Sequence, residues 1–247
     1  MVVAAPSLTE GPYFVDEILH RNDIRVDPSD DSIQPGFPLN LTINLFRVDN
    51  CVVTPLPGAF VDIWQCSALG VYSDVAAQNT VGKRFLRGYQ ITDRAGQAQF
   101  QTVFPGWYSG RAVHIHHKVR FFSQNQETYE FTSQFFFDDA VSDAIFTTAP
   151  YNQKGSPDTR NSTDGIYRGA STTGAITAGS GALLIPQVDR KEGSASATFN
   201  LVLDVAAGST PDDAPTGGGP GGGGPPPGAG GPPGGGVPPG GNRPPGA

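Results

Sequence analysis

Apolar and polar residues alternate along two stretches of this chain, with the period of a β-strand. Residues 39–45 read LNLTINL and residues 196–204 read SATFNLVLD, so one set of alternate positions is apolar in each. Successive side chains of a strand point to opposite faces, so each stretch predicts a strand that buries one face. Similar patterns at residues 60–64, 98–102, 113–122 and 129–137 predict a fold built from strands.

Turn residues separate these predicted strands. TPLPG at residues 54–58 and DRAG at residues 93–96 have the Gly, Pro and Asp residues that tight turns favour. One short helix is expected after Asp138 and Asp139, and irregular loops are expected between about 140 and 180. The sequence therefore predicts an all-β fold, an antiparallel β-sandwich with long irregular loops and at most one or two short helices.

The composition of the chain changes after residue 210. Of the 37 residues from 211 to 247, 16 are Gly and 12 are Pro. Such a segment has few side chains that pack into a core, and it lacks the strict three-residue glycine period of collagen. We expect one β-sandwich domain over residues 1–210, followed by a disordered or polyproline-like tail over residues 211–247.

Charge and hydropathy argue against two kinds of partner. The chain has 16 Lys and Arg against 23 Asp and Glu, a formal net charge of −7, whereas nucleic-acid-binding proteins present clustered cations. No stretch reaches the roughly 18 consecutive apolar residues of a membrane-spanning helix. We expect neither a nucleic-acid nor a membrane partner. The first residues, MVVAAPSLTEGPYF, show no secretory signal, which is either absent or already removed.

Two cysteines, Cys51 and Cys66, flank the segment VVTPLPGAFVDIWQ. A turn and a strand of this length can return the second thiol to the first, and a disulfide closing a loop of about 15 residues stabilises by roughly 3 kcal/mol. The alternative is two small buried core residues. Asn40 and Asn161 begin glycosylation acceptor sequences, a short pattern that also occurs by chance.

Three histidines lie in the segment RAVHIHHKV at residues 111–119. In a strand, His114 and His116 share one face, about 6.5–7 Å apart at their backbones, while His117 points to the other face. Neutral imidazole is the commonest side-chain ligand of transition metals, so the pair indicates half of a metal site. The alternative is two ordinary surface or hydrogen-bonded histidines.

The other ligands of such a site must come from elsewhere, because no histidine follows His117. A cupin-like site needs a later histidine, and a zinc site with three imidazoles needs the distant His20. A facial-triad iron site needs a His-x-Asp or similar pair, which the segment does not provide. Tyrosines, however, are near: Tyr72 ends GVY, and Tyr108 ends FPGWY directly before the histidine strand.

Four segments resemble the intradiol ring-cleavage dioxygenases, especially their secreted fungal branch: LTEGPYF, PLPGAFVDIWQCSALGVYSDV, FLRGYQITDRAGQAQF and TVFPGWYSGRAVHIH. The resemblance runs from residue 8 to residue 138, and more loosely to residue 205. The ordered set Gly-x-Tyr, Pro-Gly-x-Tyr and Arg-x-x-His-x-His is highly specific. The resemblance implies that Tyr72, Tyr108, His114 and His116 hold a non-haem Fe(III) ion. Phenolates are hard anionic donors that suit this ion, and no organic cofactor is expected.

The resemblance also implies roles for residues around the metal. Tyr108 matches a ligand that leaves the metal when the diol binds, and Arg111 matches an arginine that stabilises negative charge at the ring. Gln134 matches a glutamine that hydrogen-bonds near the reacting ring. Pro12 and Tyr13 match a Gly-Pro-aromatic stretch that lines the substrate pocket, although the same residues are also suited to fixing a turn.

The function implied by this resemblance is cleavage of a catechol-type aromatic diol by O2, between its two hydroxyl carbons, to a cis,cis-muconate-type product. The expected partners are the small aromatic diol and O2. A monomer is expected, because the chain lacks the helical dimerisation region of bacterial relatives. Secreted relatives often have a cysteine pair where Cys51 and Cys66 lie, which favours the disulfide and an extracellular location. The competing hypothesis is a non-catalytic β-sandwich binding module tethered by its Gly/Pro tail.

Overall fold

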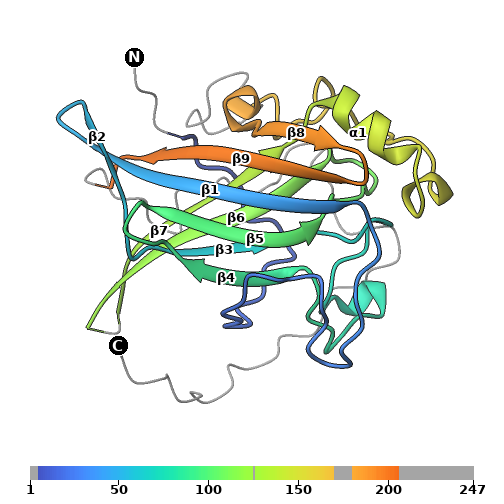
Figure 1. Cartoon of the computed structure of the whole chain (residues 1–247), viewed down its shortest axis with the longest axis horizontal. Coiled ribbons are helices and arrows are strands. Elements are labelled where there is room, and N and C mark those ends of the chain that lie inside the picture. Colours follow the sequence, from blue (N-terminus) through green and yellow to red (C-terminus); the bar gives the residue numbers. More distant parts are fainter. Residues whose placement is uncertain (1–4, 125, 170–179, 206–247) are drawn as a thin grey trace.

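A computed structural model describes residues 5–124, 126–169 and 180–205. Figure 1 shows strands in two layers, with a helix and long connections gathered near one end of the strands. The predicted all-β sandwich is confirmed, with one short α-helix in the described part of the chain. Residues 211–247, the predicted tail, lie outside the described residues. No helix among the described residues is long and apolar enough to cross a membrane.

The strands form one five-stranded and one four-stranded sheet. The five-stranded sheet has the order β2-β1-β9-β8, with β5 also paired to β1, and the other sheet has the order β4-β3-β6-β7. The elements are β1 (Pro38–Asp49), β2 (Val52–Pro55), β3 (Phe60–Trp64), β4 (Arg87–Ile91), β5 (Gln97–Val103), β6 (His114–Ser123), β7 (Gln126–Phe136), α1 (Asp139–Phe146), β8 (Gln187–Lys191) and β9 (Ser194–Leu203), with 3-10 helices at Ala76–Gln78, Tyr151–Gln153 and Ser180–Leu184.

Strand β1 organises the five-stranded sheet. One edge of β1 pairs antiparallel with β5 and then with β2, and its other edge pairs in parallel with β9. The parallel pair departs from the antiparallel sandwich predicted from the sequence. It arises because β9 follows β1 only after the chain has passed through strands of both sheets, and such a long crossover, unlike a hairpin, can bring two strands together in parallel.

The core lies between the two sheets. Ile43 on β1 and Phe199 on β9 point inward from one sheet, and Ile63 on β3 and Phe135 on β7 point inward from the other. The rings of Phe135 and Phe199 meet across the interface with centroids 4.4 Å apart. Each such side chain stabilises the fold by about 1.5–3 kcal/mol relative to an exposed one. This core fixes which face of the four-stranded sheet points outward.

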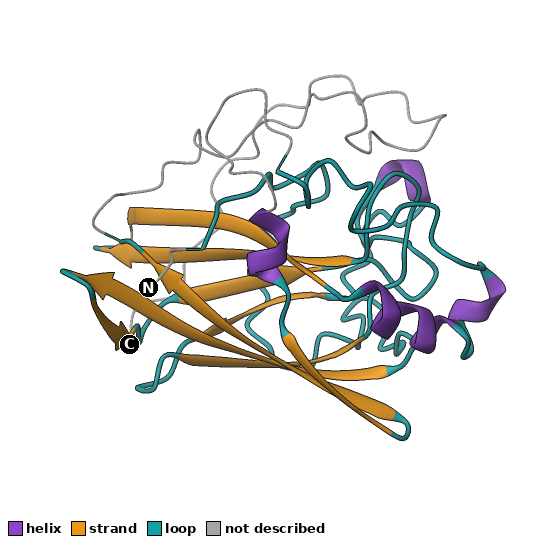
Figure 2. Cartoon of the chain, turned by 90° about the horizontal axis from the view of Figure 1, so that it is seen from above, coloured by secondary structure: helices purple, strands orange, loops and turns teal. Residues whose placement is uncertain are grey.

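The outer face of the four-stranded sheet is covered by the N-terminal segment. Leu8 N donates a hydrogen bond to the Thr132 carbonyl at 2.9 Å, and an ion pair of 2.5 Å joins Glu10 to Lys118. These contacts carry the chain along the sheet toward the end where the long loops and α1 gather (Figure 2). The histidine pair of β6 lies beneath this segment, on the outer face.

The predicted disulfide between Cys51 and Cys66 is wrong, because both are free cysteines. Cys51 is exposed in the turn between β1 and β2, whereas Cys66 is buried just beyond β3. The chain between them does not double back: β2 belongs to the five-stranded sheet and β3 to the four-stranded one. The alternative of a buried core cysteine holds for Cys66 alone.

The two glycosylation sequences differ in their surroundings. Asn40 is exposed on β1. Asn161 is 8% exposed, and its side-chain nitrogen donates to the Phe137 carbonyl at 2.8 Å. A glycan needs that nitrogen, so the structure disfavours modification of Asn161.

We expect the Ile43→Ala variant to lower the free energy of unfolding by about 2–5 kcal/mol, because it leaves a cavity between the sheets. Asn40→Ala is the matched control, since Asn40 lies on the same strand with an exposed side chain, and its effect should stay within about 0.5 kcal/mol. Urea unfolding followed by circular dichroism measures both. Equal destabilisation by the two variants would contradict this assignment of the faces of β1.

Candidate metal centre

Four side chains from one strand and two loops bring their donor atoms together at one end of the four-stranded sheet. The Nε2 atom of His114 lies 3.1 Å from Nε2 of His116, 3.2 Å from the Tyr108 hydroxyl and 3.5 Å from the Tyr72 hydroxyl. Tyr72, His114 and His116 are buried, and Tyr108 is half-buried. The structure therefore brings all four predicted ligands together.

Strand β6 supplies the two imidazoles. Its pairing places His116 opposite Trp64 of β3 and opposite Gln134 of β7. The Trp64 ring stacks on the His116 ring, with centroids 4.8 Å apart and planes 9° apart. The Nδ1 atom of His114 lies 2.6 Å from the Ala112 carbonyl, so Nδ1 carries the proton and Nε2 presents a lone pair.

Two loops supply the tyrosines, and glycines allow these loops to touch. Tyr72 follows β3, and Tyr108 lies between β5 and β6. Gly70 has φ +82°, and a Cβ atom there would collide with the Trp107 carbonyl. A Cβ atom on Gly106 would collide with the carbonyls of Ser67 and Ala68. The glycines of the Gly-x-Tyr and Pro-Gly-x-Tyr motifs thus permit the backbone contact that brings both hydroxyls to the histidines.

The donor atoms are uncharged in the protein alone. Burial raises the pKa of Tyr72 well above its usual value and raises that of Tyr108 to about 12. Burial lowers the pKa of His114 to about 3 and that of His116 well below its usual value. At neutral pH the centre therefore holds two phenols and two neutral imidazoles, with no positive charge on any of the four ligands.

This arrangement fits a metal ion. Ligand nitrogen and oxygen atoms lie about 2.0–2.2 Å from a first-row metal, so neighbouring ligands around one ion lie roughly 3–3.5 Å apart, as they do here. Two imidazole lone pairs 3.1 Å apart repel each other unless a proton or a cation lies between them. Together these features suit a cation that accepts two nitrogen and two oxygen donors.

The zinc alternative is not supported. His20 stacks on Tyr89 of β4 with centroids 5.0 Å apart, and none of its contacts reaches the histidine pair. In the described part of the chain, no three His, Cys, Asp or Glu side chains gather as a metal site. His117 points into the core, as predicted, and stacks on Phe135 at 3.9 Å. Burial lowers the pKa of His117 to about 3.

Arg111 and Gln134 meet beside the four candidate ligands. Nη2 of Arg111 donates to Oε1 of Gln134 at 2.5 Å, and Nε2 of Gln134 donates to the Thr9 carbonyl at 2.8 Å. Both side chains are buried. The strand register makes Gln134 the direct cross-strand neighbour of His116.

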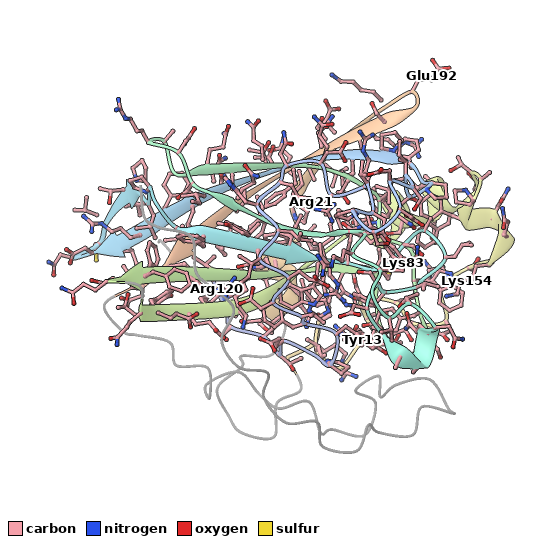
Figure 3. All side chains as sticks on the ribbon, turned by 90° about the horizontal axis from the view of Figure 1, so that it is seen from below. Tyr13, Arg21, Lys83, Arg120, Lys154 and Glu192 are labelled. Carbon is pink, nitrogen blue, oxygen red and sulfur yellow. The ribbon has the colours of Figure 1, made fainter. Side chains whose placement is uncertain are left out.

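The Gly-Pro-Tyr stretch lies against the same site. Tyr13 stacks on Tyr72 with centroids 4.5 Å apart, and its carbonyl accepts a hydrogen bond of 2.7 Å from Arg87. Pro12 is exposed next to it. In Figure 3, Tyr13 lies toward the end of the molecule where the loops gather, whereas Arg120 lies further along the strands. Tyr13 therefore packs directly against Tyr72, one of the four candidate ligands.

Sequence reasoning missed two residues of this site. Trp64 belongs to a predicted strand, but its contact with His116 depends on the β3–β6 register. Asp164 is 1% exposed and accepts a hydrogen bond of 2.9 Å from Nε of Arg111. Asp164 lies in a loop without periodicity, so only the folded chain reveals this contact.

The comparisons with known proteins agree with this geometry. A protein-family model with the description "Dioxygenase" matches residues 9–204 of this chain. A comparison with curated proteins found no match. Among solved structures, an intradiol ring-cleavage dioxygenase from Tetranychus urticae is 32% identical, with a TM-score of 0.68 over 85% of this chain and 98% of that chain.

Two further structures share the fold. The dioxygenase domain of a dioxygenase and carbohydrate-binding protein fusion from Streptomyces sp. SirexAA-E is 27% identical, with a TM-score of 0.54 over 82% of this chain and 99% of that chain. A 3-chlorocatechol 1,2-dioxygenase from Rhodococcus opacus 1CP is 18% identical, with a TM-score of 0.53 over 81% of this chain and 72% of that chain. With its two tyrosines and two histidines converging at one point, the chain belongs to the intradiol ring-cleavage dioxygenase family.

Proposed function

We propose that this chain is a non-haem Fe(III) intradiol dioxygenase that cleaves catechol-type diols with O2 to cis,cis-muconate-type products. The observation that carries the proposal is the convergence of Tyr72, Tyr108 and His116 on Nε2 of His114, within 3.1–3.5 Å. Members of this family generally depend on non-haem Fe(III). Two phenolates and two imidazoles are a hard, anionic donor set that suits this ion.

The proposed ligands of the iron are Tyr72, Tyr108, His114 and His116. When bound, the iron supplies a Lewis acid that holds both diol oxygens and draws electron density from the ring, which makes the ring reactive toward O2. The protein supplies the orientation of the ligands. The hydrogen bond from Nδ1 of His114 to the Ala112 carbonyl and the stacking of Trp64 on His116 fix the two imidazole rings.

Tyr108 is the proposed acceptor of one diol proton. It is half-buried, whereas Tyr72 is fully buried and stacked under Tyr13. Of the two tyrosines, Tyr108 therefore has more freedom to move away from the ligand cluster. As a phenolate, its hydroxyl oxygen takes the proton from the incoming diol and becomes neutral. The partial burial of Tyr108 raises its pKa to about 12, which favours this transfer.

Arg111 and Gln134 are proposed to act on the ring. The buried guanidinium stabilises negative charge that develops on the substrate, and Gln134 holds the guanidinium from one side. Pro12 and Tyr13 are proposed to line the substrate pocket, next to Tyr72. Catechol, hydroxyquinol, pyrogallol, protocatechuate and larger lignin-derived diols share the two adjacent oxygens that this chemistry requires. The monomeric state, the extracellular location and the secreted fungal branch stay predictions.

The test of the proposed function is a visible spectrum of the iron-loaded protein, before and after anaerobic addition of catechol. We expect a burgundy phenolate-to-iron band that shifts with catechol, and muconate absorbance with O2 consumption after air is admitted. Tyr72→Phe should lose part of the band, while Tyr13→Phe, which removes a stacked but non-ligating hydroxyl, should keep it. A protein that stays colourless with Fe(III) and consumes no O2 with any diol would sink the proposal and favour the binding module.

A second prediction concerns how the affinity for iron depends on pH. Because burial keeps both phenols protonated in the protein alone, each must lose its proton when it binds Fe(III), whereas the histidines are already neutral. Apparent iron affinity should therefore rise with pH, by about 100-fold per pH unit for two released protons. Tyr108→Phe should reduce this slope to about tenfold per unit, and Tyr13→Phe should leave it unchanged.

These slopes are measured by letting each variant compete with the same chelator for Fe(III) at several pH values. The pH dependence of the chelator is the same for every variant and cancels when the variants are compared. Identical slopes for the wild type and Tyr108→Phe would exclude Tyr108 as a phenolate ligand, whatever the activity of the protein.

A further inference from the structure

Asp164 uses both of its carboxylate oxygens beside the site. Oδ2 accepts hydrogen bonds from Nε of Arg111 at 2.9 Å and from the Ala112 amide at 2.7 Å. Oδ1 accepts from the amides of Ile166 at 2.7 Å and Tyr167 at 3.1 Å. One buried carboxylate therefore joins the loop after α1 to the segment that leads into β6.

The same loop holds this segment at other points. Lys154 Nζ donates to the Trp107 carbonyl at 2.6 Å, and the Trp107 indole nitrogen donates to the Gly155 carbonyl at 3.0 Å. Oδ1 of Asp158 accepts from the Gly110 amide at 3.2 Å. Residues 107–112, which include Tyr108 and Arg111, are thus fastened along their length by residues 154–164. Of these contacts, the one from Asp164 reaches the guanidinium.

Arg111 is held from two sides. Asp164 binds Nε and Gln134 binds Nη2, and Gln134 is itself fixed by the Thr9 carbonyl. Two hydrogen bonds in different directions fix the plane of a guanidinium, and the bond to a carboxylate is the stronger kind. Burial by itself raises the pKa of Asp164, but the charge of Arg111 and the backbone amides outweigh burial and hold this pKa below its usual value. Asp164 is therefore ionised at neutral pH.

We propose that Asp164 is a positioning residue that fixes the orientation of Arg111 toward the reacting ring. This inference rests on the proposed function for its effect on catalysis, but the orientation itself is a property of the metal-free protein. A carboxylate that only closed the loop around Ile166 and Tyr167 would not need Arg111. The contact between Asp164 and Arg111 thus distinguishes positioning from simple loop closure.

Asp164→Asn is the test variant, because its amide oxygen can still accept from the Ile166 and Tyr167 amides, whereas the charge and the acceptor that face Arg111 are lost. In the iron-loaded full chain, we expect kcat/KM for catechol to fall roughly 10- to 100-fold, as for a misplaced catalytic group. Iron content and the visible band should not change. Asp143→Asn is the matched control: it removes an exposed ion pair with Arg160 in the same loop and should leave activity unchanged.

A double-mutant cycle separates positioning from loop closure. If Asp164 acts through Arg111, adding Asp164→Asn to Arg111→Gln should cause no further loss. A loss of the same size in both backgrounds would overturn the proposal, and so would full activity of Asp164→Asn. If the wild type binds iron but cleaves no diol, the proposed function fails, and orientation must be judged by a readout that does not depend on activity.

That readout is the Nε–H signal of Arg111 in the nitrogen NMR spectrum of the metal-free protein. We expect a slowly exchanging signal in the wild type that is lost or fast-exchanging in Asp164→Asn. Fast exchange in the wild type would overturn the proposal even if Asp164→Asn fails to fold. A protected signal in an inactive wild type would uphold the orientation while the proposed function fails.

Discussion

β6 pairs with β3 along one edge and with β7 along the other, and this register decides which side chains reach the outer face of the sheet. His114 and His116 point outward because Ile115 and His117 point into the core. A slip of one residue would exchange the two sets and place the ligands between the sheets. The buried apolar face therefore decides on which side of the sheet the candidate metal ligands lie.

The same packing buries histidine nitrogens without hydrogen-bond partners in the described part of the chain, which lowers the stability of the metal-free protein. Nδ1 of His116 and both ring nitrogens of His117 are buried without partners among the described residues. Unsatisfied buried polar groups cost about 1–3 kcal/mol each. Nε2 of the same His116 ring faces the donor cluster, and a cation bound there would stabilise the folded state as a whole. The cost at His117 lies in the core, where stacking on Phe135 gives only partial compensation.

Local patterns predicted the features that depend on local geometry. Alternation predicted the strands and the shared face of His114 and His116, and the family resemblance implied Tyr72 and Tyr108. The predictions that were wrong concern contacts between segments that are distant in the sequence. The Cys51–Cys66 disulfide was wrong because β2 and β3 enter different sheets, and the parallel β1–β9 pair requires a crossover that no motif marks.

The motif glycines show how a sequence pattern is physically linked to the candidate metal site. Tyr72 and Tyr108 lie on separate loops, and their hydroxyls can meet at His114 only if the two backbones touch. Gly70 and Gly106 sit at that contact, where any side chain would collide with a carbonyl of the other loop. The fixed spacing from each glycine to its tyrosine therefore sets how far each hydroxyl lies from the contact between the loops, besides marking the motif in the sequence. A substitution at either glycine would separate the two phenols without removing a ligand, and would impair the centre through geometry alone.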